Sequence, residues 1–136
     1  MTSQKWGRVR DCMKPGVTEV DGKLDVLSAM KVMKEVGATS LIVKRRDEHD
    51  EYGMLLFSDI AKKVIGPDRA PERVNVYEIM AKPVVTVKPD MHIRYCARLF
   101  ENFGIGHAPV EEDGKIIGIV SYYRLVLYGL KDLIDD

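Results

Sequence analysis

The sequence holds few of the residues that build metal centres and disulfide frameworks. Its 136 residues include two cysteines and three histidines. The histidines His49, His92 and His107 are scattered, and no cysteine joins them at the spacing of a structural zinc site. Cys12 and Cys96 align with Ile and Ala in an internal repeat described below. We therefore expect two reduced, buried cysteines rather than a disulfide or a catalytic thiol.

Long apolar segments and an excess of one charge are also missing. No run approaches the about 18 apolar residues of a membrane span, and residues 1–10 do not resemble a signal peptide. Lys and Arg number 21, as do Asp and Glu, so the net charge is zero. The nearest candidate for a basic patch, Lys44–Arg46, is followed at once by the acidic run 47–51. These features predict a cytoplasmic protein with neither a nucleic-acid nor a membrane partner.

Motifs of catalysis are absent as well. The segment Gly104–Gly106 lacks the rest of a Walker or dinucleotide-binding motif. Ser121 and Cys96 have no base placed by spacing, and no pair of acids is marked out for hydrolysis. We expect that the chain is not an enzyme and requires no metal or cofactor.

What the chain does contain is a duplication. A shift of 67 positions superposes it on itself, for example Met13 on Met80. After Val43 the shift falls to 65, because the loop Arg45–Tyr52 is two residues longer than its counterpart at 112–117. This period is too long for most solenoid repeats. It predicts two copies of one small αβ unit that share a core and leave a pair of related clefts.

Each copy is expected to contain a helical turn, an extended segment, a helix, a β-hairpin and a closing helix. Apolar residues at helical spacing indicate the helices, and Gly37 and Gly104 follow them where left-handed C-caps are expected. Asp113-Gly114 is typical of a tight hairpin. The runs 41–43 and 116–120 are apolar on both faces, which predicts burial on both sides. The expected ranges in the two copies are 9–13 and 76–80, 16–20 and 83–87, 25–36 and 91–103, 40–44 with 52–56 and 107–111 with 116–121, and 58–65 and 122–130.

These elements predict an α/β (α+β) fold with two tandem repeats, each a small sheet packed against two helices, related by a pseudo-two-fold axis. The expected parts are an N-terminal extension (1–8), repeat 1 (9–65), a linker (66–73), repeat 2 (74–130) and a C-terminal tail (131–136). A chain of 136 residues with 46% hydrophobic content can bury a substantial core.

The order of elements and several motifs resemble the CBS domain, named for cystathionine β-synthase. The tandem copy resembles a stand-alone CBS pair, or Bateman module. The resemblance is carried by Ile79–Asp90, Phe103–Val110 and Gly118–Leu125, and more loosely by Cys12–Pro15, Val36–Val43 and Gly53–Ile60. It implies a regulatory module that binds an adenosine-containing ligand between its repeats, of the AMP, ADP, ATP, S-adenosylmethionine or NAD type. A regulated partner protein, which the sequence does not identify, would respond to that ligand.

The resemblance also implies a first ligand cleft. In the family, a Ser/Thr-x-x-Asp segment at the start of the closing helix holds the ribose, and the segment after Met-x-Pro of the other repeat lines the adenine slot. Asp59 stands at the acid position, where it could accept both diol hydroxyls or could only cap the helix. Leu56 replaces the Ser/Thr and removes one hydroxyl contact. The predicted first cleft comprises Phe57, Ser58, Asp59, Met80, Val84 and Val85.

In the implied second cleft, Arg124 stands where the ribose acid should be. A guanidinium cannot accept a hydrogen bond, so this cleft is predicted to reject a diol and to favour an anion. Ser121 and His107 would be co-ligands, although His107 could instead be an ordinary histidine at the edge of the core. The predicted second cleft comprises Met13, Val17, Thr18, Gly106, His107, Ser121, Tyr123 and Arg124.

Three functions remain open from the sequence. The first is a ligand sensor, and the second is an interaction or assembly module with vestigial clefts, which the changes at Leu56 and Arg124 motivate. A weaker third is an enzyme that acts on the bound nucleotide. A homodimer is expected because the long helices carry more apolar surface than one sheet needs. Amphipathic rings suited to an interface would come from Tyr95, Tyr122, Tyr123 and Tyr128.

Overall fold

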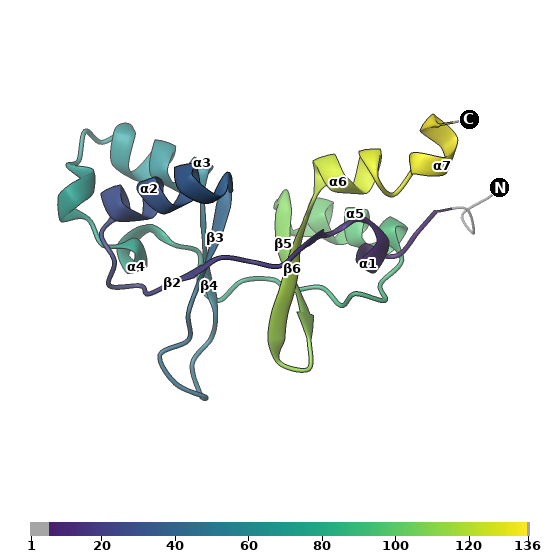
Figure 1. Ribbon diagram of the computed structural model, residues 1–136, viewed down its shortest axis with the longest axis horizontal. Helices are drawn as coiled ribbons and strands as arrows, with labels where there is room; N and C mark the ends of the chain where they lie inside the picture. The colour runs from purple at the N-terminus through teal and green to yellow at the C-terminus, as the bar shows by residue number, and fades with distance from the viewer. Residues whose placement is uncertain (1–5, 136) are drawn as a thin grey trace. The chain divides into compact units, whose positions relative to one another are not determined.

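The computed structural model describes residues 6–135 and divides the chain into two compact units. Within the described residues, the central unit is residues 18–84, and the terminal unit combines residues 6–17 with 85–135. Each holds a three-stranded sheet and helices, which confirms the predicted α/β class (Figure 1). The boundaries of the two units differ from those of the two sequence repeats. The first residues of repeat 1 belong to the unit that holds most of repeat 2, and the first residues of repeat 2 belong to the unit that holds most of repeat 1.

The central unit is built on the sheet β2-β3-β4. Strands β2 and β3 are parallel, and β3 and β4 form the expected antiparallel hairpin. Helix α2 starts after Asp25, whose carboxylate accepts a hydrogen bond from the Ser28 N–H at 2.9 Å, and it ends at Gly37 with φ 70°. The elements are β2 (Glu19–Val20), α2 (Val26–Val36), β3 (Ser40–Val43), β4 (Gly53–Leu56), α3 (Phe57–Ile60), the π-helical turn η2 (Ala61–Ile65), the 3₁₀ turn η3 (Pro71–Arg73) and α4 (Val76–Ile79).

The core of the central unit explains why residues 74–84 belong to it. The buried stripe of α2 packs with the hairpin, and Val76 and Ile79 of α4 are almost completely buried in the same cluster. Each such side chain stabilises the fold by about 1.5–3 kcal/mol on burial. The buried members are Val20, Val26, Ala29, Met33, Leu41, Val43, Leu55, Ile60, Val64, Val74, Val76 and Ile79.

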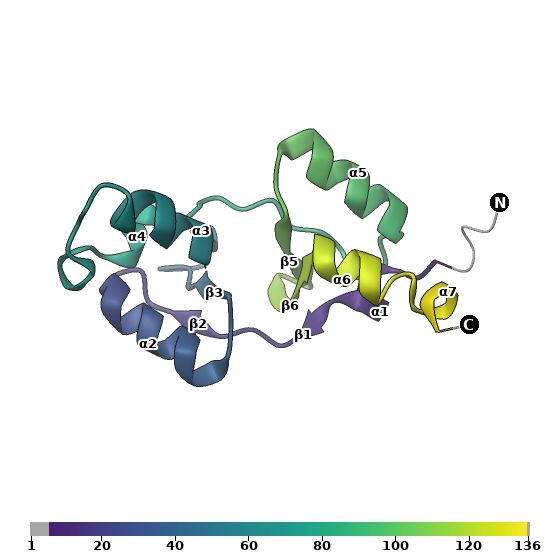
Figure 2. The same ribbon diagram turned by 90° about the horizontal axis from the view of Figure 1, so that it is seen from above.

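The terminal unit is built on the sheet β1-β6-β5, in which both neighbouring pairs are antiparallel. Its hairpin turns at Asp113 and Gly114, with φ 53° and 78°, as the Asp-Gly sequence predicts. The rings of Phe100 on α5 and Tyr122 on α6 meet edge to face at 5.2 Å. The elements, seen from above in Figure 2, are α1 (Val9–Cys12), β1 (Lys14–Pro15), α5 (Ile93–Phe103), β5 (His107–Glu112), β6 (Lys115–Ser121), α6 (Tyr122–Leu127) and α7 (Lys131–Ile134).

Both cysteines lie in the core of the terminal unit. Cys12 and Cys96 are free and fully buried, as predicted. Burial raises the pKa of Cys12 to about 11 and that of Cys96 to about 12. Because the thiolate is the reactive form, these thiols are packing groups rather than nucleophiles at neutral pH.

Three local predictions were wrong. The extended segment 83–87 forms only one bridge, between Val87 and Val110. The closing helix of the second repeat ends at Leu127 instead of residue 130, and α7 follows after a turn. Burial on both faces holds for β3 but not for β6, where Ile117 and Ile119 are only half-buried because one face of that strand points away from the core.

Candidate functional site

In the central unit, the segment after α4 runs beside the start of β4. The main chains of Met54 and Ala81 exchange two hydrogen bonds, each of 2.9 Å. A Cβ on Gly53 would lie 2.6 Å from the sulfur of Met80, so glycine is what lets this methionine lie against the strand. The predicted first-cleft residue Met80 is therefore held next to the strand that leads into α3.

The terminal unit repeats this arrangement with the N-terminal segment. Lys14 pairs with Ile119 of β6. A Cβ on Gly118 would lie 2.6 Å from the carbonyl oxygen of Lys14 and 2.9 Å from the sulfur of Met13. Met13 and Met80 thus occupy equivalent places, each against a glycine of a hairpin strand.

Asp59 lies in the first turn of α3, and its two carboxylate oxygens have different surroundings. Oδ2 accepts a hydrogen bond from the Leu56 N–H at 2.9 Å, so the side chain caps the helix. Oδ1 lies 3.7 Å from Nζ of Lys63, and the side chain is 15% exposed. Capping and ligand binding are therefore compatible, because the second oxygen keeps acceptor capacity.

The other predicted residues of the first cleft differ in their exposure and do not all belong to one unit. Phe57 and Ser58 are exposed, whereas Met80 and Val84 are half-buried. Val85 belongs to the terminal unit, so five of the six predicted residues come together in one unit. Lys63 was not singled out in the sequence. Its Nζ donates to the Ile79 carbonyl at 3.0 Å and thereby links the start of the closing helix to the Met80 segment.

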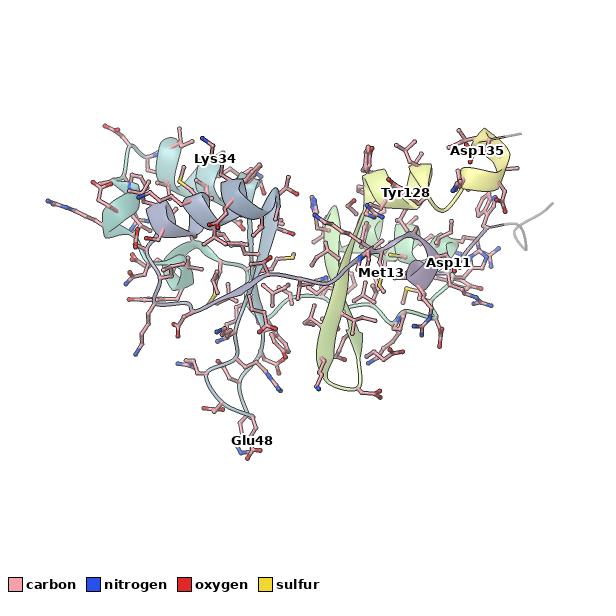
Figure 3. The ribbon with its side chains drawn as sticks, in the orientation of Figure 1. Asp11, Met13, Lys34, Glu48, Tyr128 and Asp135 are labelled. Carbon is pink, nitrogen blue, oxygen red and sulfur yellow. The ribbon has the colours of Figure 1, made fainter. Side chains whose placement is uncertain are left out.

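In the terminal unit, Arg124 is held by main-chain oxygens. Its Nε donates to the Cys12 carbonyl at 2.7 Å and its Nη2 to the Met13 carbonyl at 3.4 Å. The guanidinium also lies 4.2 Å from the centre of the Tyr128 ring, a cation–π contact between α6 and its C-cap residue. Figure 3 labels Met13 and Tyr128, the two ends of this arrangement. Ser121 caps α6, its hydroxyl accepting from the Arg124 N–H at 3.3 Å.

The remaining predicted residues of the second cleft are divided between the two units. His107 on β5 lies opposite Ser121 on β6, and burial lowers the pKa of its imidazole, which favours the neutral ring at pH 7. The carbonyl of Gly106 accepts the N–H of Tyr122 at 3.2 Å. Val17 is half-buried, Tyr123 is exposed, and Thr18 is the first residue of the central unit.

The long loop of the first hairpin is fastened at its base. The Asp50 side chain, 8% exposed, accepts from Nε of Arg46 at 3.0 Å and from Nζ of Lys82 at 2.8 Å. These hydrogen bonds, that of Arg46 first, hold the pKa of the Asp50 carboxyl well below its usual range. Glu48 stands exposed at the tip of the loop (Figure 3). Lys82, two residues after Met80, is thereby tied to the hairpin.

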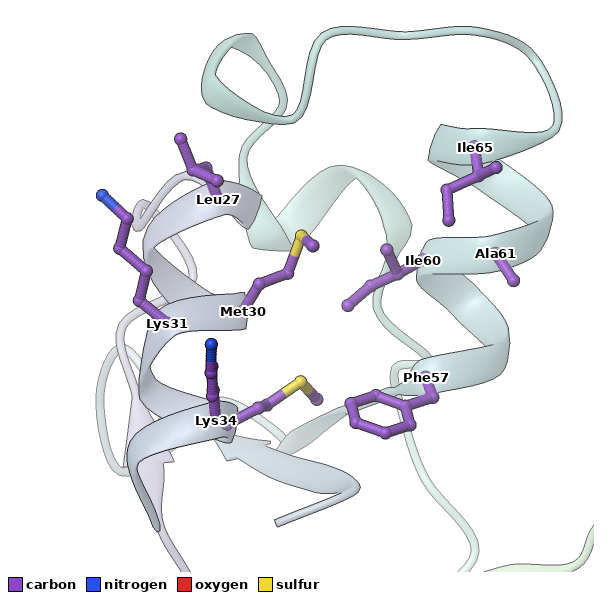
Figure 4. Close-up of a pocket in the computed structure, with 9 residues that line it drawn as sticks. Leu27, Met30, Lys31, Lys34, Phe57, Ile60, Ala61 and Ile65 are labelled. Atoms are coloured by element: carbon purple, nitrogen blue, oxygen red, sulfur yellow. The ribbon is translucent and has the colours of Figure 1, made fainter. Parts of the chain in front are cut away.

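A groove of about 630 Å³ lies between α2 and the closing helix of the central unit (Figure 4). Phe57 is the only predicted cleft residue in its wall, and its ring points toward α2. Its lysines, Lys31 and Lys34, are the only charged residues of an otherwise apolar lining. The lining residues are Leu27, Met30, Lys31, Met33, Lys34, Phe57, Ile60, Ala61 and Ile65.

Residues 6–135 offer neither a metal-binding cluster nor a membrane-spanning helix. No three acidic, histidine or cysteine side chains in this range gather where they could hold a metal ion. No helix in the same range has the length and apolar character needed to cross a membrane.

The comparisons with known proteins agree with the fold. The family model of the CBS domain matches residues 76–131. The crystal structure of a hexameric CBS-CP12 protein from bloom-forming cyanobacteria is 36% identical, with a TM-score of 0.89 over 92% of this chain and 69% of that chain.

Two of the curated relatives come from Methanopyrus kandleri and Methanosalsum zhilinae. An uncharacterized protein from Methanopyrus kandleri is 35% identical over 91 residues, which are 65% of this chain and 45% of that protein. A homoserine O-acetyltransferase from Methanosalsum zhilinae is 34% identical over 113 residues, 82% of this chain and 22% of that enzyme. The chain thus spans less than half the length of both relatives.

Proposed function

Because this chain belongs to the CBS-domain family, we propose that its central unit binds an adenosine-containing ligand and that Asp59 receives the ribose. The strongest support for this proposal is that the two oxygens of the Asp59 carboxylate have different surroundings. One oxygen caps α3, and among the described residues the other has no closer partner than Lys63 at 3.7 Å. An ionised carboxylate accepts hydroxyl hydrogen bonds without donating any, which suits a cis-diol.

The neighbours of Asp59 suit the rest of such a ligand. Met80 and Val84 are half-buried apolar residues and would contact the adenine ring, with the polarizable sulfur favourable against an aromatic face. Leu56 offers no hydroxyl, so the ribose would depend on Asp59 more strongly than a Ser/Thr-x-x-Asp site does. Most of the proposed contacts are therefore made with the uncharged adenosine moiety of the ligand.

We expect one adenosine site per chain. In the terminal unit, the position equivalent to Asp59 is Arg124, whose Nε and Nη2 donate to the carbonyls of Cys12 and Met13. A guanidinium offers no acceptor to a diol. Whether this unit takes an anion beside Arg124, with Ser121 and His107, stays a prediction.

The role of the ligand would be regulatory. A ligand that binds one conformation of the chain better than another shifts the population toward it, and couplings of this kind are typically about 1–3 kcal/mol. A partner protein would respond to the favoured conformation. No catalytic step and no cofactor beyond the regulatory nucleotide are part of this proposal.

Self-association is the second part of the proposal. The apolar groove between α2 and α3 is open on the central unit, and Tyr122, Tyr123 and Tyr128 are exposed on the terminal unit. Aromatic and apolar side chains of this kind are enriched at the centres of protein interfaces. We propose a homodimer that buries these helical faces. The hexameric state of the cyanobacterial CBS-CP12 relative is in keeping with an assembling module.

The test is direct. The purified chain is denatured, and the released small molecules are identified by mass spectrometry. The chain is then melted with AMP, ADP, ATP, S-adenosylmethionine or NAD in excess. A ligand at 100 times its Kd should stabilise the fold by about 2.7 kcal/mol. If none of the five raises the Tm and nothing is released, the sensor proposal fails. An assembly function would then be the better account if the chain is oligomeric.

A further inference from the structure

The closing helices of the two units carry equivalent pairs of side chains four residues apart. The shift of 65 that aligns the hairpins also places Asp59 on Arg124 and Lys63 on Tyr128. In the central unit the pair is an ion pair, with 3.7 Å between Lys63 Nζ and Asp59 Oδ1. In the terminal unit it is a cation–π pair, with Arg124 4.2 Å from the centre of the Tyr128 ring.

Each pair supplies one cation to the same place in its unit. Lys63 donates to the carbonyl of Ile79, the last residue of α4, at 3.0 Å. Arg124 donates to the carbonyl of Cys12, the last residue of α1, at 2.7 Å. Cys12 and Ile79 are equivalent under the shift of 67. The same contact is therefore made twice, from different positions of the closing helix.

We propose that this side-chain pair decides which unit can accept a ribose, and that Lys63 is a positioning residue of the adenosine site. The inference rests on the proposed function. In the central unit the cation is Lys63, so position 59 can be an acid while the Met80 segment is still held by a hydrogen bond to the Ile79 carbonyl. In the terminal unit the cation is Arg124, which stands at the acid position itself. The hydrogen bond to the Cys12 carbonyl is kept there, but the carboxylate that would accept from a ribose is lost, and Tyr128 stacks on the guanidinium.

The physical reason is the chemistry of a helix end. The last carbonyls of a helix lack intrahelical donors and carry partial negative charge, so a cation there forms a charge-assisted hydrogen bond. Without that bond, the turn that leads into Met80 loses its link to η2, which continues directly from α3. The ribose-binding carboxylate and the adenine-facing segment would then no longer be held in one geometry, which weakens binding without changing any group that touches the ligand.

The first test needs no ligand. In Lys63→Met, hydrogen exchange of the Met80 and Ala81 amides should accelerate at least tenfold, and Lys63→Arg should restore protection. Lys62→Met is the matched control, because its exposed side chain has no hydrogen bond or ion pair within residues 6–135. Unchanged exchange in Lys63→Met overturns the fastening role. In calorimetry with AMP, Lys63→Met should bind about tenfold more weakly than the native chain, as expected for the loss of one charged hydrogen bond.

The second test transplants the pair. Arg124→Asp combined with Tyr128→Lys should raise the stoichiometry for AMP from one to two per chain, whereas Arg124→Asp alone should leave it at one. The converse change, Asp59→Arg with Lys63→Tyr, should keep the Met80 segment protected and abolish binding. A double variant that folds with one site, or a converse variant that still binds AMP, overturns the inference. If the native chain binds no adenosine ligand, the proposed function fails while the exchange experiment still decides the fastening.

Discussion

Gly118 lies directly against the main chain of Lys14, and a Cβ on this glycine would be 2.6 Å from the Lys14 carbonyl oxygen. Gly118→Ala must push β1 away from β6, so we expect a loss of about 1–3 kcal/mol in the free energy of unfolding. Urea denaturation measures it. Gly106→Ala is the control, because its Cβ would meet only the Tyr122 ring at an ordinary 3.5 Å. Equal effects of the two substitutions would contradict the close approach.

The base of the long hairpin loop should make stability depend on pH. Hydrogen bonds from Arg46 and Lys82 depress the folded-state pKa of Asp50. The resulting stabilisation is present above the unfolded-state pKa, about 3.9, and is lost as the pH falls toward the folded value. Asp50→Asn should therefore flatten the decline in stability between about pH 5 and pH 3. Glu48→Gln, at the exposed loop tip, should keep the native decline. The check is urea unfolding across this pH range, and identical slopes for the two variants would be inconsistent with the Asp50 contacts.

His107 should produce a second pH effect at higher pH. Burial lowers its pKa in the folded state, so below the unfolded-state value of about 6.5 the unfolded chain binds more protons. The stabilisation of the fold that depends on a neutral His107 is thus fully present above about pH 6.5 and is lost as the pH falls below this value. His107→Gln should reduce this slope, whereas His49→Gln, on the exposed loop, should not. A native slope in His107→Gln would show that this burial has no energetic consequence.

Self-association should depend on the groove between α2 and α3. Phe57 is 53% exposed in the groove wall, so Phe57→Asp should spare the fold and weaken dimerisation roughly tenfold or more. Tyr77→Asp is the matched control, since Tyr77 is equally exposed at 53% but lies on α4, outside the groove. Analytical ultracentrifugation at several concentrations measures the dimer. If Phe57→Asp dimerises like the native chain, the groove is not the dimer interface.

Much of the fold could be predicted because local signals agree with tertiary packing. The apolar stripes of α2 and α5, the glycines at positions 37 and 104 and the Asp-Gly turn each specify structure within a few residues. The sequence could not show that the first segment of each repeat packs in the unit of the other repeat. A repeat in sequence shows which residues are alike and not which ones are in contact. Nothing near Val9 or Val76 reveals the core each joins.

The candidate site was foreseen in part for the same reason. Asp59 and Met80 are marked by their motifs, and the structure places both in the central unit. Lys63 and Tyr128 carry no motif. The proposed role of Lys63 rests on its contact with a carbonyl of α4, and that of Tyr128 on its contact with the Arg124 guanidinium. Both contacts are seen only in three dimensions.

The most direct measurement is the affinity of Asp59→Asn for AMP by titration calorimetry. Asparagine keeps an acceptor for the Leu56 N–H but loses the charge, so the fold should retain most of its cap energy while AMP binds about tenfold to a hundredfold more weakly. Glu35→Gln removes a charge from an exposed position on α2 of the same unit and should bind AMP like the native chain. Native affinity in Asp59→Asn, with the native Tm, would show that this carboxylate only caps its helix and would contradict the proposed ribose site.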